Sequence, residues 1–97
     1  METLDRHMIN IEKEEINQLH FDHKEVLLTK LSKKERNRNL NRGLILGNAF
    51  HTKVKIIFED DSNLYQVETT IWGLGQDFVL LKQGTFIPRK RIHQVII

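Results

Sequence analysis

Hydrophobic and polar residues alternate with a period of two from Lys53 onward, as they do in β-strands that bury one face. In the segment KVKIIFED this places Val54, Ile56 and Phe58 on one side. The segment LYQVETTIW keeps the alternation over an unusually long strand, and the turn-forming residues DDSN separate it from the first. Three shorter segments follow, FVLLK, TFIP and HQVII. Residues 51–97 are therefore predicted to form five short antiparallel strands.

The connections between these strands are short. Gly73 and Gly75 allow the long second strand to bend sharply, and QG at 83–84 is typical of a tight turn. Pro88 cannot donate a hydrogen bond to a neighbouring strand and so ends the fourth strand, and RKRI is predicted to form one 3₁₀-like turn. Five strands joined in this way predict a small SH3-like barrel.

A helical period replaces this alternation upstream, in residues 22–50. SKKE at 32–35 has the form of a capping box, which predicts a main helix from about Lys33 to Asn48. Asp22 is a candidate cap for an earlier helical turn. The main helix has an apolar, glycine-containing side that we expect to cover an open end of the barrel. That side holds Leu40, Gly43, Leu44, Leu46, Gly47 and Phe50. The predicted fold class is mostly β with an N-terminal helix.

Residues 1–21 show only weak periodicity, with a few isoleucines scattered among charges. We expect this segment to be a flexible acidic arm or a short helix. Charge is unevenly distributed: residues 1–25 carry a net −4, residues 30–42 carry +5, and residues 89–91 add +3 in a chain whose total is +2. Such asymmetry is an argument about binding partners. The alternative is that the acidic arm screens the basic patch within the same molecule.

Length and composition narrow the class of protein. A chain of 97 residues with 39% hydrophobic and 29% charged residues is typical of one soluble domain. The absence of cysteine excludes a disulfide framework and a thiolate metal site. The chain shows no signal-peptide pattern and no run of about 18 apolar residues, so we expect a cytoplasmic protein that does not contact membranes.

The helix, together with the segments QDFVLLK and RKRIHQVI, resembles the Sm-like barrel of bacterial Hfq-type RNA chaperones and of the small Sm-like Rho inhibitors. The likeness covers residues 51–97 and the helix in front of them. It implies a five-stranded antiparallel Sm-like barrel capped by a helix, and binding of single-stranded RNA. The Lys-His pair with which the Hfq-type family reads RNA corresponds here to Arg89 and Lys90, so the positive charge is kept without the histidine. The glycine usual between the first two strands of that family is replaced by DDSN.

Two groups of cations are candidates for contact with RNA phosphates. Arg89, Lys90 and Arg91 stand in the connection between the last two predicted strands, where an exposed rim can meet phosphates without disturbing the core. The second group lies at four-residue spacing along the helix and consists of Lys34, Arg38 and Arg42. The plain alternative for both groups is a solvated surface.

Proteins that bind single-stranded nucleic acid combine such cations with aromatic side chains on which bases stack. Tyr65, Trp72 and Phe86 are the candidates in this chain. The alternative for Trp72 is that it fills the core, which is the commoner position for a tryptophan beside a glycine bend. RNA binding predicts that Tyr65 and Trp72 are exposed beside the cations, whereas a protein-interaction module predicts that they are buried and that an apolar patch is exposed instead.

Motifs for catalysis or metal binding are weak. His20 and His23 lie three apart with Asp22 between them, but two imidazoles have no third obvious ligand. GLG at 73–75 and RGLILGN at 42–48 lack the other residues of a dinucleotide loop and a phosphate loop. We therefore expect no enzymatic activity, no metal and no cofactor.

The sequence thus predicts a non-catalytic accessory or regulatory protein that binds single-stranded RNA. The alternative is a protein–protein interaction module that docks an acidic partner and forms homo-oligomers through exposed strand edges.

Overall fold

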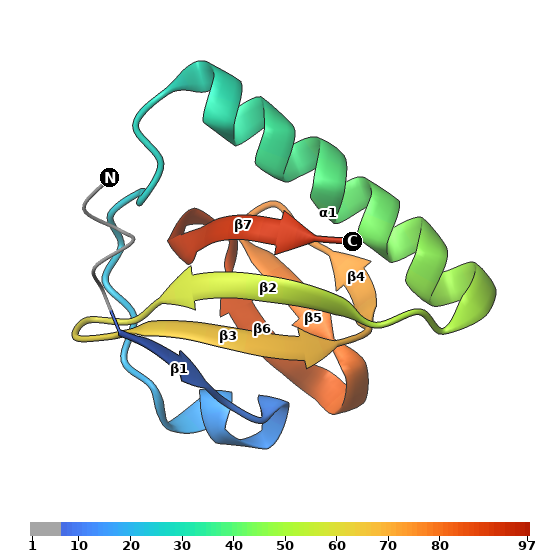
Figure 1. The fold of residues 1–97 in the computed structure, drawn as a ribbon, viewed down its shortest axis with the longest axis horizontal. Coiled ribbons are helices and arrows are strands. Elements are labelled where there is room, and N and C mark those ends of the chain that lie inside the picture. Colours follow the sequence, from blue (N-terminus) through green and yellow to red (C-terminus); the bar gives the residue numbers. More distant parts are fainter. Residues whose placement is uncertain (1–6) are drawn as a thin grey trace.

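The structure is a computed structural model, and it describes residues 7–97 as one long helix and seven strands in two sheets (Figure 1). The strands are β1 (Met8–Asn10), β2 (Val54–Glu59), β3 (Leu64–Thr69), β4 (Ile71–Leu74), β5 (Phe78–Leu81), β6 (Thr85–Pro88) and β7 (Ile92–Ile96). The helices are α1 (Lys30–Phe50) and the 3₁₀ turns η2 (Lys13–Gln18), η3 (Lys82–Gly84) and η4 (Arg89–Arg91). The first sheet has the order β1-β3-β2-β7, and the second has the order β4-β5-β6.

From Val54 onward the structure confirms the predicted succession of short strands. Alternate residues of β2 are buried, and β2 pairs antiparallel with both β3 and β7. The long second strand is divided at Thr70 into β3 and β4, which belong to different sheets, so the chain leaves one sheet before it reaches Gly73. The result is a mostly β structure with one α-helix, in two sheets that are not closed into a barrel.

The start of α1 differs from the prediction. The cap is Thr29, whose hydroxyl oxygen accepts a hydrogen bond from the backbone N–H of Ser32 at 3.0 Å, and the helix begins at Lys30. Ser32 therefore lies inside the helix, because the preceding threonine satisfies the exposed N–H first.

The helical turn predicted from Asp22 is wrong, because residues 22–29 form no helix. The Asp22 and Glu25 carboxylates instead accept hydrogen bonds from backbone N–H groups two residues downstream, at 3.2 and 3.0 Å. Such local bonds compete with helix formation. The backbone N–H of Val26 also donates to the carbonyl of Lys90 at 2.9 Å, which ties this segment to η4.

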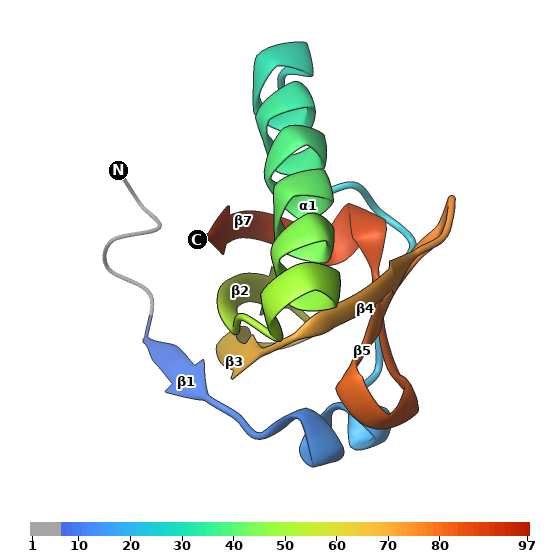
Figure 2. The same cartoon turned by 90° about the vertical axis from the view of Figure 1, so that its right-hand side faces the viewer.

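Helix α1 lies alongside β7 and β4 (Figures 1 and 2). A Cβ atom on Gly47 would lie 2.6 Å from the Ile71 carbonyl oxygen, so glycine is required where the helix meets the backbone of β4. Two α1 side chains, Arg36 and Asn39, donate to the carbonyls of Ile92 and Val95 at 3.0 and 3.4 Å. The helix thereby covers the outer edge of β7, an edge that would otherwise be open to pairing with another chain.

The predicted acidic arm lies partly outside the described residues, which begin at His7. Its described part packs on the body of the protein. Strand β1 pairs in parallel with β3, and η2 lies against β6. Ile16 of η2 is fully buried in the core, with Ile9, Ile11, Leu19 and Phe21 partly buried around it.

The core fills the space between the two sheets, α1 and η2. Its fully buried apolar side chains are Ile16, Leu40, Val54, Ile56, Phe58, Val67, Ile71, Val79, Leu81, Ile87 and Ile92. Among the described residues, no helix is long and apolar enough to cross a membrane.

Candidate nucleic-acid interface

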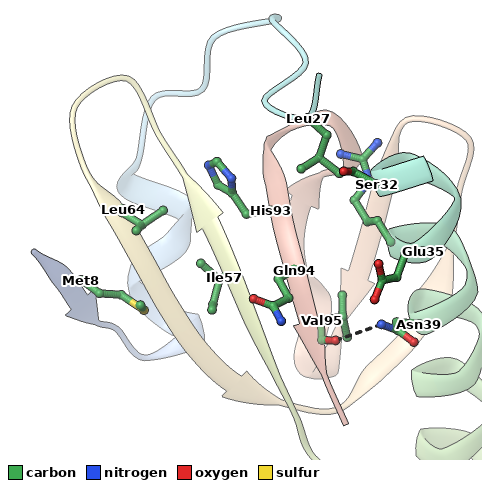
Figure 3. Close-up of a pocket in the computed structure, with 11 residues that line it drawn as sticks. Met8, Leu27, Ser32, Glu35, Asn39, Ile57, Leu64, His93, Gln94 and Val95 are labelled. Carbon is green, nitrogen blue, oxygen red and sulfur yellow. Dashed lines mark hydrogen bonds between the residues drawn. The ribbon is translucent and has the colours of Figure 1, made fainter. Parts of the chain in front are cut away.

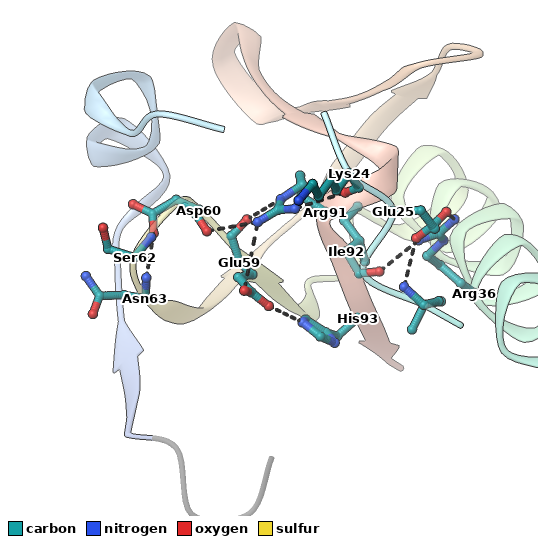
Figure 4. A network of polar contacts seen from close by, with 11 residues as sticks. Lys24, Glu25, Arg36, Glu59, Asp60, Ser62, Asn63, Arg91, Ile92 and His93 are labelled. Carbon is teal, nitrogen blue, oxygen red and sulfur yellow. Dashed lines mark hydrogen bonds and ion pairs between the residues drawn. The ribbon is translucent and has the colours of Figure 1, made fainter. Parts of the chain in front are cut away.

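Arg91, the third cation of the predicted cluster, is a structural residue (Figure 4). It is 5% exposed, and its guanidinium donates to the backbone carbonyls of Glu59, Asp60 and Lys24 at 3.1, 3.0 and 2.9 Å. The prediction that Arg91 meets phosphates is therefore wrong, because all three donating nitrogens are turned inward and hold three chain segments together.

The other two cations of the cluster differ from each other. Arg89 is half-buried, and its guanidinium donates to the Gly75 carbonyl at 2.9 and 3.2 Å and to the Asn37 side-chain oxygen at 3.0 Å. Lys90 is exposed. The densest positive run in the sequence therefore offers one free cation, one that is half-buried and one that is buried.

Tyr65 is not an exposed stacking platform. It is 7% exposed and stacks on Phe58, with ring centroids 5.5 Å apart. Its hydroxyl donates to the Asp60 carboxylate at 3.2 Å. The same carboxylate accepts the backbone N–H groups of Ser62 and Asn63, so Tyr65 supports the β2–β3 turn from the core side.

The helix stripe of Lys34, Arg38 and Arg42 is exposed on the side of α1 opposite the buried Arg36 and Leu40. This arrangement agrees with the predicted four-residue spacing. Within the described chain, however, none of the three cations lines a hollow of the second sheet. The structure therefore separates this stripe from the aromatic residues described next.

Three aromatic rings gather on the outer face of the second sheet. Trp72 of β4, Phe78 of β5 and Phe86 of β6 are 48%, 50% and 52% exposed. Phe78 and Phe86 contact each other edge to face, with centroids 6.2 Å apart. Leu80 pairs with Phe86 across the strands and lies between Trp72 and Phe78. We call this group of Trp72, Phe78, Leu80 and Phe86 the aromatic face.

Trp72 lies at a β-bulge and faces away from the core, on the side of β4 opposite the buried Ile71. Ile71 pairs with Leu81 and Gly73 pairs with Leu80, so Trp72 has no partner of its own on β5. A bulge of this kind twists the strand and re-aims one side chain. The exposure of Trp72 excludes a core position and agrees with the prediction for RNA binding. The prediction also placed Trp72 beside the cations of residues 89–91, but the hollow that Trp72 lines contains Lys82 and none of those three.

Phe78 was missed as a candidate although its position is readable from the sequence. Once Val79 and Leu81 are assigned to the core, alternation places Phe78 and Leu80 on the opposite face. All residues from Phe78 to Leu81 are apolar, so alternation within this strand alone does not show which pair faces outward.

Three hollows follow one another along the aromatic face. The first, of about 560 Å³, contains Trp72 and Leu80. The second, of about 510 Å³, contains Leu80, Phe78 and Phe86. The third, of about 660 Å³, contains Phe78 together with Phe21. Neighbouring hollows share Leu80 or Phe78 as a lining residue, and we call the three hollows together the track.

Cations stand at both ends of this track. Lys82 lines the first hollow. Lys33, Arg36, Arg89 and Lys90 line the third, together with the acidic Asp22, Glu25 and Asp77. Glu25 is paired with Arg36 through two contacts of 2.7 Å, which neutralises both charges. The track thus combines a mildly positive end, a row of aromatic rings and a second cation.

The Glu25–Arg36 pair determines the ionisation of Glu25. Partial burial acts to raise the pKa of Glu25, but hydrogen bonds from Arg36 and from the Leu27 backbone outweigh it, so the pKa lies below the ordinary value of 4.5. Arg36 is 6% exposed and also donates to the Ile92 carbonyl. The pair fixes the segment before α1 onto the sheet rather than offering charge to a ligand.

A separate hollow of about 360 Å³ lies over the first sheet, between β1 and α1 (Figure 3). Met8, Ile57 and Leu64 form its sheet side, and Ser32 and Asn39 project from the helix. It contains none of the predicted aromatic or cationic candidates. Among the described residues, no group of three or more His, Asp or Glu side chains could hold a metal ion.

Comparison with known proteins identifies no relative: no family model, no curated protein and no solved structure matches this chain.

Proposed function

We propose that this protein binds single-stranded RNA without catalysis, along the track of the aromatic face, as an accessory or regulatory factor. The observation that carries the proposal is the row of three half-exposed aromatic rings on one sheet face, with lysines at both ends. Bases have flat π-faces and stack on exposed aromatic rings, typically contributing about 1–3 kcal/mol per base. Phosphates between the bases are attracted by the flanking lysines.

The exposed rings are better suited to this role than to protein stability. Each leaves about half its surface in water, although aromatic side chains of this size normally gain free energy from burial. Trp72 in particular lies at a β-bulge of β4. Bulges are common next to functional sites because they re-aim a side chain.

We also propose that residues 51–97 have the architecture of a five-stranded Sm-like barrel. A five-stranded Sm-like barrel is supported by the order of β2 to β7, in which the bent second strand runs from the first sheet into the second. It is also supported by the pairing of the first of these strands, β2, with the last, β7, and by the position of η4 between β6 and β7. In this arrangement α1 precedes the strands and covers the edge of β7.

Fluorescence anisotropy of a labelled mixed-sequence RNA, measured across a salt series, tests the proposal. If Lys82, Arg89 and Lys90 neutralise three phosphates, log affinity should fall with log salt at a slope of about −2. The double variant Lys82→Ala, Lys90→Ala should reduce the slope to about −0.7. Arg38→Ala is the matched control, since it removes an exposed cation outside the track and should leave the affinity unchanged. Absence of binding at low salt would overturn the proposal.

The aromatic contribution is tested separately. Phe86→Ala should weaken RNA binding by about fivefold or more, since the loss of one stacked base costs at least about 1 kcal/mol. Ile45→Ala, which shortens an exposed apolar side chain of α1, should have no effect on RNA binding. Equal affinities of the two variants would show that the ring of Phe86 takes no part in RNA binding.

A second candidate function, docking of an acidic protein, is favoured by a different observation. Leu31, Lys34, Arg38, Arg42 and Ile45 follow one another along the outer side of α1, and all five are exposed. A row of cations with an apolar residue at each end fits an acidic helix or loop that carries apolar anchors. This face is distinct from the aromatic face, so Arg38→Ala separates the two functions.

A further inference from the structure

The C-terminal end of α1 lies beside β4 (Figure 2), and residues of both elements line the hollow at the Trp72 end of the track. Its apolar walls come from Trp72 and Leu80, and its polar groups come from both the helix end and the sheet. The lining polar side chains are Asn48, His51, Thr70 and Lys82. Gly47 also lines the hollow, and a Cβ atom at this position would lie 2.6 Å from the Ile71 carbonyl oxygen.

An unusual backbone conformation occurs at the rim of this hollow. Among the described residues, His51 and Gln83 are the non-glycine residues with positive φ, at 57° and 68°. His51 lines the hollow, and Gln83 follows the lining residue Lys82. L-residues with side chains are disfavoured in this left-handed region, where glycine or asparagine is usual. Residues held in such conformations cluster at ligand sites.

The left-handed backbone of His51 ends α1, whereas the imidazole of His51 takes no part in ending the helix. The backbone N–H of His51 donates to the Gly47 carbonyl at 2.9 Å, and that of Thr52 donates to the Leu46 carbonyl at 3.3 Å. Both bonds involve backbone atoms alone, so glycine would close the helix equally well and with less strain. The imidazole of His51 therefore has no part in closing the helix, and His51 shares the lining of this hollow with Trp72.

We infer that this hollow is a base pocket that takes one unpaired nucleobase of the bound RNA. The base stacks on Trp72, His51 forms a second wall, and the Asn48 amide offers a donor and an acceptor to the base edge. Lys82 binds the adjoining phosphate. This inference rests on the proposed function and adds to it a defined position where a base, rather than the RNA backbone, is recognised.

The test combines stability with binding. His51→Gly should raise the melting temperature by a few degrees, because glycine relieves the left-handed strain. The same variant should bind a fluorescein-labelled uridine octamer about three- to tenfold more weakly. An octamer of abasic ribose phosphates, which keeps the charge and lacks the bases, should bind wild type and His51→Gly equally.

Gln83→Gly is the matched control, since it relieves strain of the same kind at a residue that does not line the hollow. It should raise the melting temperature and leave uridine octamer binding unchanged. If His51→Gly is more stable and binds the uridine octamer as wild type does, the base pocket is refuted while RNA binding stands. If wild type binds neither octamer, the proposed function itself is refuted.

Discussion

Replacement of Arg91 by alanine should destabilise the protein strongly, although the residue stands in the most basic run of the chain. Its guanidinium is the hydrogen-bond donor for three backbone carbonyls, from Glu59, Asp60 and Lys24. An acceptor left unsatisfied in a buried site costs about 1–3 kcal/mol. Partial access of water to the vacated space limits the total, so we expect a loss of about 3–5 kcal/mol.

That loss is large relative to the stability of a domain of this size. Domains of this kind unfold with a free energy of roughly 5–15 kcal/mol, and 1 kcal/mol shifts the melting temperature by about 4–8 °C. Arg91→Ala should therefore lower the melting temperature by at least about 12 °C. Arg91→Lys should also be destabilised, because an ammonium group lacks the planar fork that reaches all three carbonyls.

Urea unfolding followed by circular dichroism measures this difference. Lys90→Ala is the internal control, since an exposed neighbouring cation should change the free energy of unfolding by no more than about 0.5 kcal/mol. The reasoning is refuted if Arg91→Ala and Lys90→Ala unfold within about 1 kcal/mol of each other. That result would mean that the three carbonyls find other donors at little cost.

Further changes have defined outcomes. Tyr65→Phe removes the hydroxyl that donates to Asp60 and should lower the free energy of unfolding by about 1 kcal/mol, measured in urea. Gly47→Ala forces a Cβ atom to within 2.6 Å of the Ile71 carbonyl and should cost about 1–3 kcal/mol in thermal unfolding, although alanine is otherwise the better helix former. Because the pKa of Glu25 is lowered in the folded state, its stabilising contribution is present above pH 4.5 and is lost as the pH falls through the lowered value. Acid unfolding of Glu25→Gln should lack this component, and an identical pH profile for both proteins would contradict the ion-pair argument.

The strands were predictable because their signal is local. A period of two over four to six residues fixes which side chains face the core, and β2 shows the predicted burial of Val54, Ile56 and Phe58. The 3₁₀ turn at RKRI was predictable for a similar reason, since Pro88 removes a donor and ends the strand before it. Chain reversals with such clear residue preferences need no tertiary information.

Features that depend on distant contacts were not predictable in the same way. Nothing local to the N-terminal segment states that β1 pairs with β3 or that Ile16 fills the core, because both depend on a surface created by the later strands. The bulge at Trp72 likewise depends on tertiary contacts, since it arises from the pairing of β4 with β5.

The number of cations in a run of sequence does not show how many of them a ligand can reach. A run of three cations predicts a positive surface, but the surrounding chain decides which of them are free. Carbonyls from Lys24, Glu59 and Asp60 converge on Arg91 only after folding, and they turn a predicted phosphate contact into an internal brace. The aromatic residues also differ in exposure after folding: Tyr65 is buried, whereas Phe78 is exposed.

The emission of Trp72 offers the most direct test of the account, since the chain contains a single tryptophan and that residue lies on the aromatic face. Titration with unlabelled single-stranded RNA at low salt should quench this emission along a saturable curve, because a stacked base contacts the indole ring. The quenching should be reversed by added salt as the phosphate contacts weaken. If saturating RNA leaves the emission of Trp72 unchanged, no base stacks on this face and the proposed mode of binding is wrong.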